Sequence, residues 1–163
     1  MTPLRILMFT TFYPPHSFGG DAIGVQRMAR ALAARGHEVT GGHDEDAYAV
    51  LGGKPGPAGP PDGVRAIGLR AANGFLSNLL TQQTGRPVMH AGRIREILGE
   101  RPWDIIWYNN VSLVGGPGLL RMGEGLKIYE AHEHWLVCPT HVLWRYGREL
   151  CDRRECLRCV LSY

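Results

Sequence analysis

The stretch that decides the fold is residues 4–40, which reads LRILMFTTFYPPHSFGGDAIGVQRMARALAARGHEVT. Residues 4–9 form a nearly continuous apolar run, which predicts a strand buried on both faces of a parallel sheet. Pro14 and Pro15 end this strand because neither proline can continue a central hydrogen-bond ladder. Gly19 and Gly20 permit a positive φ and a close approach of the backbone to a ligand. The sequence therefore predicts a strand that runs into an open glycine loop.

A helix is expected directly after this loop. Apolar residues recur at helical spacing over Val25–Ala33, Asp21 is the expected N-cap, and Gly36 is the expected αL residue that ends the helix. The loop amides and the positive helix end would then point at one place, which favours a phosphate group bound at Gly19 and Gly20. Alternatively, the two glycines serve only the turn. The loop is neither a G-x-G-x-x-G fingerprint nor a Walker loop.

Composition restricts the class of protein. The 163 residues suffice for one ordinary domain, and 44% apolar with 20% charged residues is the balance of a soluble globular chain. A net charge of +3 with mostly scattered basic residues argues against a nucleic-acid partner. No apolar run approaches the roughly 18 residues that span a bilayer, and the first residues do not resemble a signal peptide. We therefore expect a cytoplasmic protein.

Further strands and helices alternate along the chain. Strands are expected at Val64–Leu69, Asp104–Tyr108 and Leu126–Tyr129. Helices are expected from Pro87 to Gly99 and from Gly115 to about Met122. Such a series of strand–helix–strand units predicts an α/β fold, a Rossmann-like open parallel sheet with flanking helices. The segment Gly52–Gly63, in which nine of twelve residues are Gly or Pro, is expected to be a loop.

Ligands of open parallel sheets bind beyond the carboxyl ends of the strands, so polar residues at those ends are site candidates. Asn109 and Asn110 follow one strand and could hydrogen-bond sugar hydroxyls, although Asn also favours turns. His132 follows another strand, where a single histidine often has a structural role only. Glu133 is a weaker candidate beside it. Trp135 could stack on an acceptor, or it could be core.

Two stretches resemble the N-terminal domain of family-4 retaining glycosyltransferases of the GT-B fold. Residues 4–40 are similar to that family's order of strand, PP, GG, helix and R-G-H-x-V, and YEAHEHWLVCPTHVLWRYGRELC is similar to its T-x-H-D-Y-W-L-x-C-P stretch. The resemblance implies retaining transfer of a sugar from a nucleotide-diphosphate sugar to an acceptor, which is often lipid-linked and so brings peripheral membrane contact. It also implies that His132 lines the cleft near the reacting centre as a catalytic residue, and that Gly19 and Gly20 lie against the donor phosphates.

The chain also departs from the family pattern. The strand before Asn109 would often end in His-x-His and here reads Trp107–Asn110. The strand that begins at Glu38 lacks the usual apolar continuation after Thr40, so we expect it to be short. The family's second Rossmann-like domain, which holds most of the donor and an E-x7-E pattern, is missing. We therefore expect a fragment, inactive alone, in which residues 1–134 form the acceptor-side domain and residues 135–163 a Cys-rich segment.

The four cysteines, Cys138, Cys151, Cys156 and Cys159, lie close together in the sequence. Clustered thiols in a cytoplasmic chain are more often metal ligands than disulfides, and the Cys-x-x-Cys pair at Cys156 and Cys159 is a chelating unit. The spacing is compatible with a structural zinc site but is not that of a standard zinc ribbon. Ordinary reduced cysteines, a disulfide and an iron–sulfur cluster are the alternatives.

Two further function classes compete with the transferase. A non-catalytic binding or regulatory module, or one subunit of a split transferase, would keep the same fold and cysteine cluster. An NAD-dependent dehydrogenase or epimerase would share the strand–loop–helix start, but it needs the G-x-G-x-x-G loop and an acidic residue after the second strand, which are not both present.

Overall fold

The structure is a computed structural model that describes residues 2–57, 59 and 62–162. It comprises two compact units, Met1–Glu130 (unit 1) and Ala131–Tyr163 (unit 2). The expected boundary lay between residues 134 and 135, so unit 2 also includes residues 131–134. In the described part of the chain, no helix is both long and apolar enough to cross a membrane.

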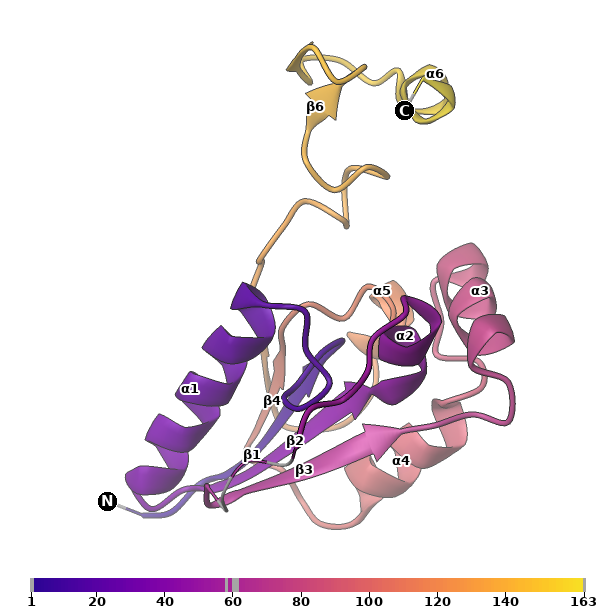
Figure 1. The fold of residues 1–163 in the computed structure, drawn as a ribbon. Coiled ribbons are helices and arrows are strands. Elements are labelled where there is room, and N and C mark those ends of the chain that lie inside the picture. The colour runs from indigo at the N-terminus through magenta and orange to yellow at the C-terminus, as the bar shows by residue number, and fades with distance from the viewer. Residues whose placement is uncertain (1, 58, 60–61, 163) are drawn as a thin grey trace. The chain divides into compact units, whose positions relative to one another are not determined.

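Unit 1 is built on a five-stranded parallel sheet with the order β3-β2-β1-β4-β5 (Figure 1). The strands are β1 (Arg5–Thr10), β2 (Glu38–Asp44), β3 (Val64–Leu69), β4 (Ile105–Tyr108) and β5 (Leu126–Tyr129). This order reverses direction between β1 and β4, as in a Rossmann-like half. The prediction of an α/β fold with an open parallel sheet is confirmed.

Helices cover both faces of this sheet. They are α1 (Gly20–Ala34), α2 (Glu45–Val50), α3 (Gly74–Thr84), α4 (Ala91–Gly99) and α5 (Gly116–Leu119). The connection from β1 to β2 leads toward the β3 edge of the sheet, and the connection from β3 to β4 leads toward the β5 edge. Because both crossovers are right-handed, α1 and α4 lie on opposite faces of the sheet (Figure 1).

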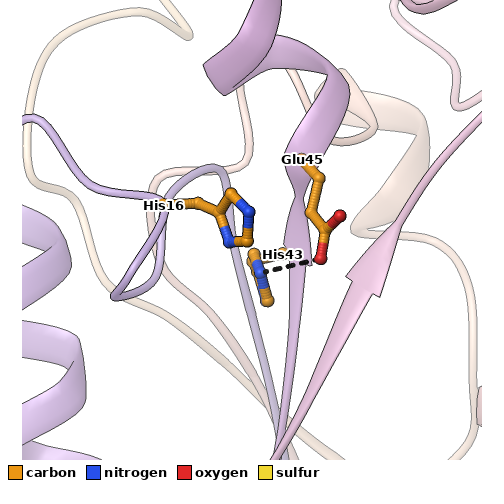
Figure 2. A group of neighbouring side chains, drawn as sticks. All are labelled: His16, His43 and Glu45. Carbon is orange, nitrogen blue, oxygen red and sulfur yellow. Dashed lines mark ion pairs between the residues drawn. The ribbon is translucent and has the colours of Figure 1, made fainter. Parts of the chain in front are cut away.

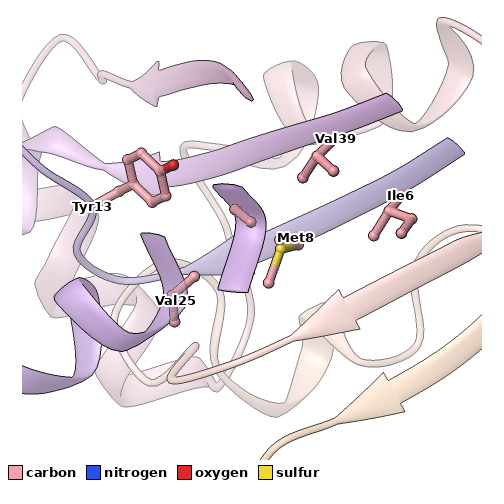
Figure 3. Close-up of a cluster of buried hydrophobic side chains, with 6 residues drawn as sticks. Ile6, Met8, Tyr13, Val25 and Val39 are labelled. Atoms are coloured by element: carbon pink, nitrogen blue, oxygen red, sulfur yellow. The ribbon is translucent and has the colours of Figure 1, made fainter. Parts of the chain in front are cut away.

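The face covered by α1 holds one part of the hydrophobic core (Figure 3). Its buried members alternate along the strands and recur along the helix: Ile6, Met8, Tyr13, Val25, Ala29 and Val39. The next residues of β1, Leu7 and Phe9, point to the other face and are fully buried. There the Phe9 ring stacks on Tyr108 with centroids 6.2 Å apart. Burial of β1 on both faces explains its continuous apolar run.

Two sequence-based expectations about this region were wrong. Asp21 is not the N-cap of α1. Gly19 holds that position, and the Asp21 Oδ1 accepts a hydrogen bond from Ala22 N within the first turn. The second strand is not short, because β2 continues to Asp44. Gly42 makes this continuation fit, since a Cβ there would lie 2.8 Å from the Phe9 ring.

The sequence reading also missed two helices. Asp44 caps α2 by accepting from Ala47 N at 2.9 Å, and Asn73 caps α3 by accepting from Leu76 N at 3.0 Å. The helix expected from Pro87 begins only at Ala91, and α5 ends at Leu119. Of the expected loop at 52–63, residues 58, 60 and 61 lie outside the described residues, and the others contain no helix or strand.

Unit 2 contains little regular structure. A two-stranded antiparallel ribbon pairs β6 (Trp144–Arg145) with β7 (Glu149–Leu150), and α6 (Cys156–Leu161) follows. Among the described residues of this unit, only Cys138, Arg145 and Cys159 are buried.

Candidate functional site

The densest group of titratable side chains in unit 1 lies at the carboxyl end of β2, where the sequence reads His43-Asp44-Glu45-Asp46. His43 and Asp44 end β2 and point to opposite sides, as successive strand residues do, and Glu45 and Asp46 follow in the first turn of α2. His43 and Glu45 meet His16, which follows β1, whereas Asp44 and Asp46 meet His90 at the start of α4. The two groups therefore lie at the edge of the sheet where open parallel sheets bind ligands.

His16, His43 and Glu45 form the first group (Figure 2). A short bridge holds His16 in place, because its backbone pairs with that of Tyr13 through hydrogen bonds of 2.8 and 3.0 Å. The imidazole rings of His16 and His43 have centroids 5.4 Å apart, and Nε2 of His43 lies 3.9 Å from Oε1 of Glu45. One donor atom from each residue lies within 4.8 Å of the others, which is close enough to hold a metal ion.

The His43 ring is buried and neutral at physiological pH. Burial lowers its pKa to about 4, and the neighbouring His16 adds to this, while Glu45 and Asp44 act in the opposite direction. Within the part of the chain that the structure describes, neither ring nitrogen of His43 has a hydrogen-bond partner. A neutral imidazole with an unused nitrogen can accept a proton or bind a metal ion.

Asp44, Asp46 and His90 form the second group, in which Asp44 and His90 are buried and Asp46 is partly buried. The Nε2 atom of His90 lies 3.5 Å from Asp44 Oδ1 and 3.6 Å from Asp46 Oδ2. Asp44 also accepts a hydrogen bond from the side-chain amide of Asn78 at 3.3 Å. This holds for the orientation of that amide in which both its nitrogen and its oxygen have a partner. Asp46 accepts from Ala71 N at 2.7 Å. These contacts tie β2, α3 and α4 together, so the second group has a structural role.

The glycine loop meets the requirement for a close ligand approach. Gly19 has a φ of 150°, which L side chains rarely adopt, so its conformation requires glycine. A Cβ placed on Gly19 or Gly20 would meet no atom within 4 Å. The first turn of α1 therefore begins beside open space, and of the amides at this helix N-terminus Gly19 N already donates to Ser17 Oγ and Ala22 N to Asp21 Oδ1.

Asn109 and Asn110, the predicted sugar contacts, both make hydrogen bonds within the fold. The Asn109 side chain is buried and donates from Nδ2 to the Phe9 carbonyl at 3.2 Å. The Oδ1 atom of Asn110 accepts from the hydroxyl and the amide of Ser112. These contacts are of the kind that the turn interpretation predicts, and a role in sugar binding stays a prediction.

The remaining predicted site residues belong to unit 2. His132 is exposed in a bend, Trp135 is half-buried in a turn, and Glu133 pairs with His141 at 3.1 Å. Gly19, Gly20, Asn109 and Asn110 belong to unit 1. The catalytic role of His132 therefore stays a prediction.

Sequence reasoning missed the His16 and His90 groups. The signal was the run HDED after two glycines, which is unusual because an apolar continuation was expected there. Alternation along a strand would have placed only His43 and Asp44 on opposite faces, because Glu45 and Asp46 begin α2. The partners His16 and His90 could not be found this way, because only the folded chain brings them to β2.

No protein-family model matches the sequence, and no curated protein is significantly similar to it.

Proposed function

We propose that this chain is the acceptor-side domain of a retaining glycosyltransferase, which acts with a donor-binding domain to transfer a sugar from a nucleotide-diphosphate sugar. The observation that carries the proposal is the glycine loop before α1. It combines a backbone conformation specific to glycine, open space beside Gly19 and Gly20, and the N-terminus of a long helix. The resemblance of residues 4–40 to family-4 enzymes gives the same interpretation.

The chemistry of sugar transfer fits this loop. The bond between the anomeric carbon and the diphosphate oxygen breaks and its electron pair goes to the diphosphate. The acceptor oxygen bonds to the anomeric carbon on the same face of the sugar, and the proton of the acceptor hydroxyl goes to the leaving diphosphate oxygen. Amides and the positive end of α1 would stabilise the charge that develops on the leaving diphosphate. By the family resemblance, His132 of unit 2 is the proposed catalytic residue. His16, which is partly exposed at the same edge of the sheet as the loop, would contact the acceptor, with the buried ring of His43 behind it.

A binding experiment with a matched pair of variants tests the proposal. We expect uridine or guanosine diphosphate to bind the purified chain and to shift the amide resonances of residues 19–22. Gly20→Ala adds a methyl group where the ligand would approach, and we expect it to weaken binding about tenfold, the cost of one lost charge-assisted hydrogen bond. Gly24→Ala is the control, because it lies one turn further along α1, also in open space. Equal affinities for the two variants, or tighter binding of NAD, would contradict the proposal.

The first histidine group favours a second candidate function, metal-assisted hydrolysis. Two histidines and a glutamate with a fourth position open form the ligand set of some catalytic zinc sites. Against this, Glu45 already pairs with Arg70. Metal-dependent ester or peptide hydrolysis that His43→Gln abolishes would favour this function over sugar transfer.

A further inference from the structure

Unit 2 lacks the hydrophobic core that would hold a fold of its size together. Its large apolar side chains include four that are more than 70% exposed: Val137, Leu150, Leu157 and Leu161. Units of this size usually need disulfides or a metal ion to stay folded. All four cysteines are free. The unit therefore needs a stabilising element other than hydrophobic burial or a disulfide.

The four cysteines surround one cavity of about 20 Å³. They reach it from different segments: Cys138 from the turn after Trp135, Cys151 from the end of the β6–β7 ribbon, and Cys156 and Cys159 from adjacent turns of α6. The cavity holds one small species, since about 10–15 Å³ measured in this way accommodates a single water molecule. Its lining offers four sulfur atoms in a largely apolar surround.

Backbone amides point at two of these sulfurs. Leu143 N donates to Cys138 Sγ, and Tyr146 N donates to Cys159 Sγ, both at 3.4 Å. Leu143 and Tyr146 are also two of the three non-glycine residues with a positive φ in the described chain, at 51° and 55°. L residues rarely adopt this conformation, so the surroundings must enforce it. Amides directed at sulfur favour the thiolate, which is the form that binds metal.

We propose that unit 2 binds one structural zinc ion through the thiolates of Cys138, Cys151, Cys156 and Cys159. Zinc is the expected ion because four thiolates in tetrahedral arrangement are the ligand set of structural zinc sites. The groups of described residues whose donor atoms lie within 4.8 Å of one another are the His16 and His90 groups, and neither contains a cysteine. Zinc binding would therefore require the four sulfurs to move closer together around the cavity. Four protein ligands leave no open position, and the ion activates no water.

Arg145 is buried and lines the same cavity. A zinc ion with four thiolates carries a net charge of about −2. The guanidinium of Arg145 already pairs with Glu149 and Asp152 at 2.9 and 3.0 Å, so it offsets the charge of the site only in part. The proposal is independent of the sugar-transfer proposal, because it concerns only unit 2.

Metal analysis of the full chain tests the proposal. We expect about one zinc per chain after desalting, and four thiols that react with a thiol reagent only after chelation. Cobalt(II) added to the chelated chain should give the sulfur-to-metal charge-transfer absorption of a tetrathiolate site. Cys156→Ser should lower the zinc content at least about tenfold, and the wild-type thiol and cobalt results stand even if that variant does not fold.

His43→Gln is the matched control, because it removes a ligand of the other metal candidate. We expect it to retain the zinc. Zinc that is lost from His43→Gln but kept by Cys156→Ser would overturn the proposal. So would iron in place of zinc, a disulfide, or four freely reactive thiols with no bound metal.

Discussion

At the scale of single residues, unit 1 pairs buried histidines with carboxylates in two different ways. Among the described residues, neither the ring nitrogens of His43 nor those of His90 have a hydrogen-bond partner. Burial lowers the pKa of His43 to about 4. His90 lies between two aspartates that also accept hydrogen bonds from backbone amides, so the carboxylates of the second group are already used in structural contacts.

The lowered pKa of His43 predicts a loss of stability in mild acid. The unfolded chain binds a proton on this ring below about pH 6.5, but the folded chain does so only below about pH 4, so the free energy of unfolding falls as the pH drops through this window. We expect His43 to contribute at most about 3 kcal/mol of this loss. Urea unfolding at pH 7 and pH 4.5, with a chelator present, measures it. His43→Gln should show a smaller loss, and an unchanged loss would contradict the assignment to His43.

Asp44 should matter more to stability than an ordinary helix cap. Asp44→Ala removes the cap of α2 and leaves His90 buried with one carboxylate fewer, so we expect it to lower the free energy of unfolding by about 3 kcal/mol or more. Asn73→Ala removes an exposed cap with the same geometry and should cost about 1 kcal/mol. Similar losses for the two variants, measured by chemical denaturation, would show that the His90 contact adds nothing.

At the scale of elements, β2 depends on glycine for its contacts with β1. Gly42→Ala would place a methyl group against the buried Phe9 ring, and we expect a loss of about 1–3 kcal/mol in the free energy of unfolding. Gly24→Ala, inside α1 and in open space, should instead stabilise the chain by up to about 1 kcal/mol. Thermal unfolding of both variants provides the measurement. A tolerated Gly42→Ala would mean that Phe9 moves aside easily.

The elements that sequence patterns predicted are those with a strong hydrophobic signal. The strands over Val64–Leu69 and Leu126–Tyr129 are confirmed, because apolar periodicity marks them. Buried polar groups decided the rest. The last residues of β2, His43 and Asp44, have side chains that meet His16 and His90 from distant segments of the chain. No local sequence pattern reveals these partners. The glycine loop was predictable because its residues are adjacent in the sequence. The histidine groups were not, because their members come from distant parts of the sequence.

At the scale of the whole molecule, the two units should differ in how they are stabilised. Unit 1 has a packed core on both faces of a sheet, whereas unit 2 has few buried residues. With zinc as the stabilising element of unit 2, a chelator should raise amide hydrogen exchange across residues 131–162 and leave residues 5–10 and 105–108 protected. Exchange measured by mass spectrometry with and without chelator tests this. Uniform protection in both conditions would show that unit 2 folds without metal.

The alternation at His43 and Asp44 has a consequence for how this protein tolerates insertions. His43 and Asp44 are the last two residues of β2, where side chains change face with every residue, and Glu45 and Asp46 follow in the first turn of α2. One extra residue between Gly42 and His43 would therefore move His43 to the face that Asp44 now occupies, toward His90 and away from His16. The number of residues in β2, and not only their identity, thus determines which side chains lie next to His16 and which lie next to His90. Homologous sequences that keep all six residues but gain or lose one position here would not preserve either site.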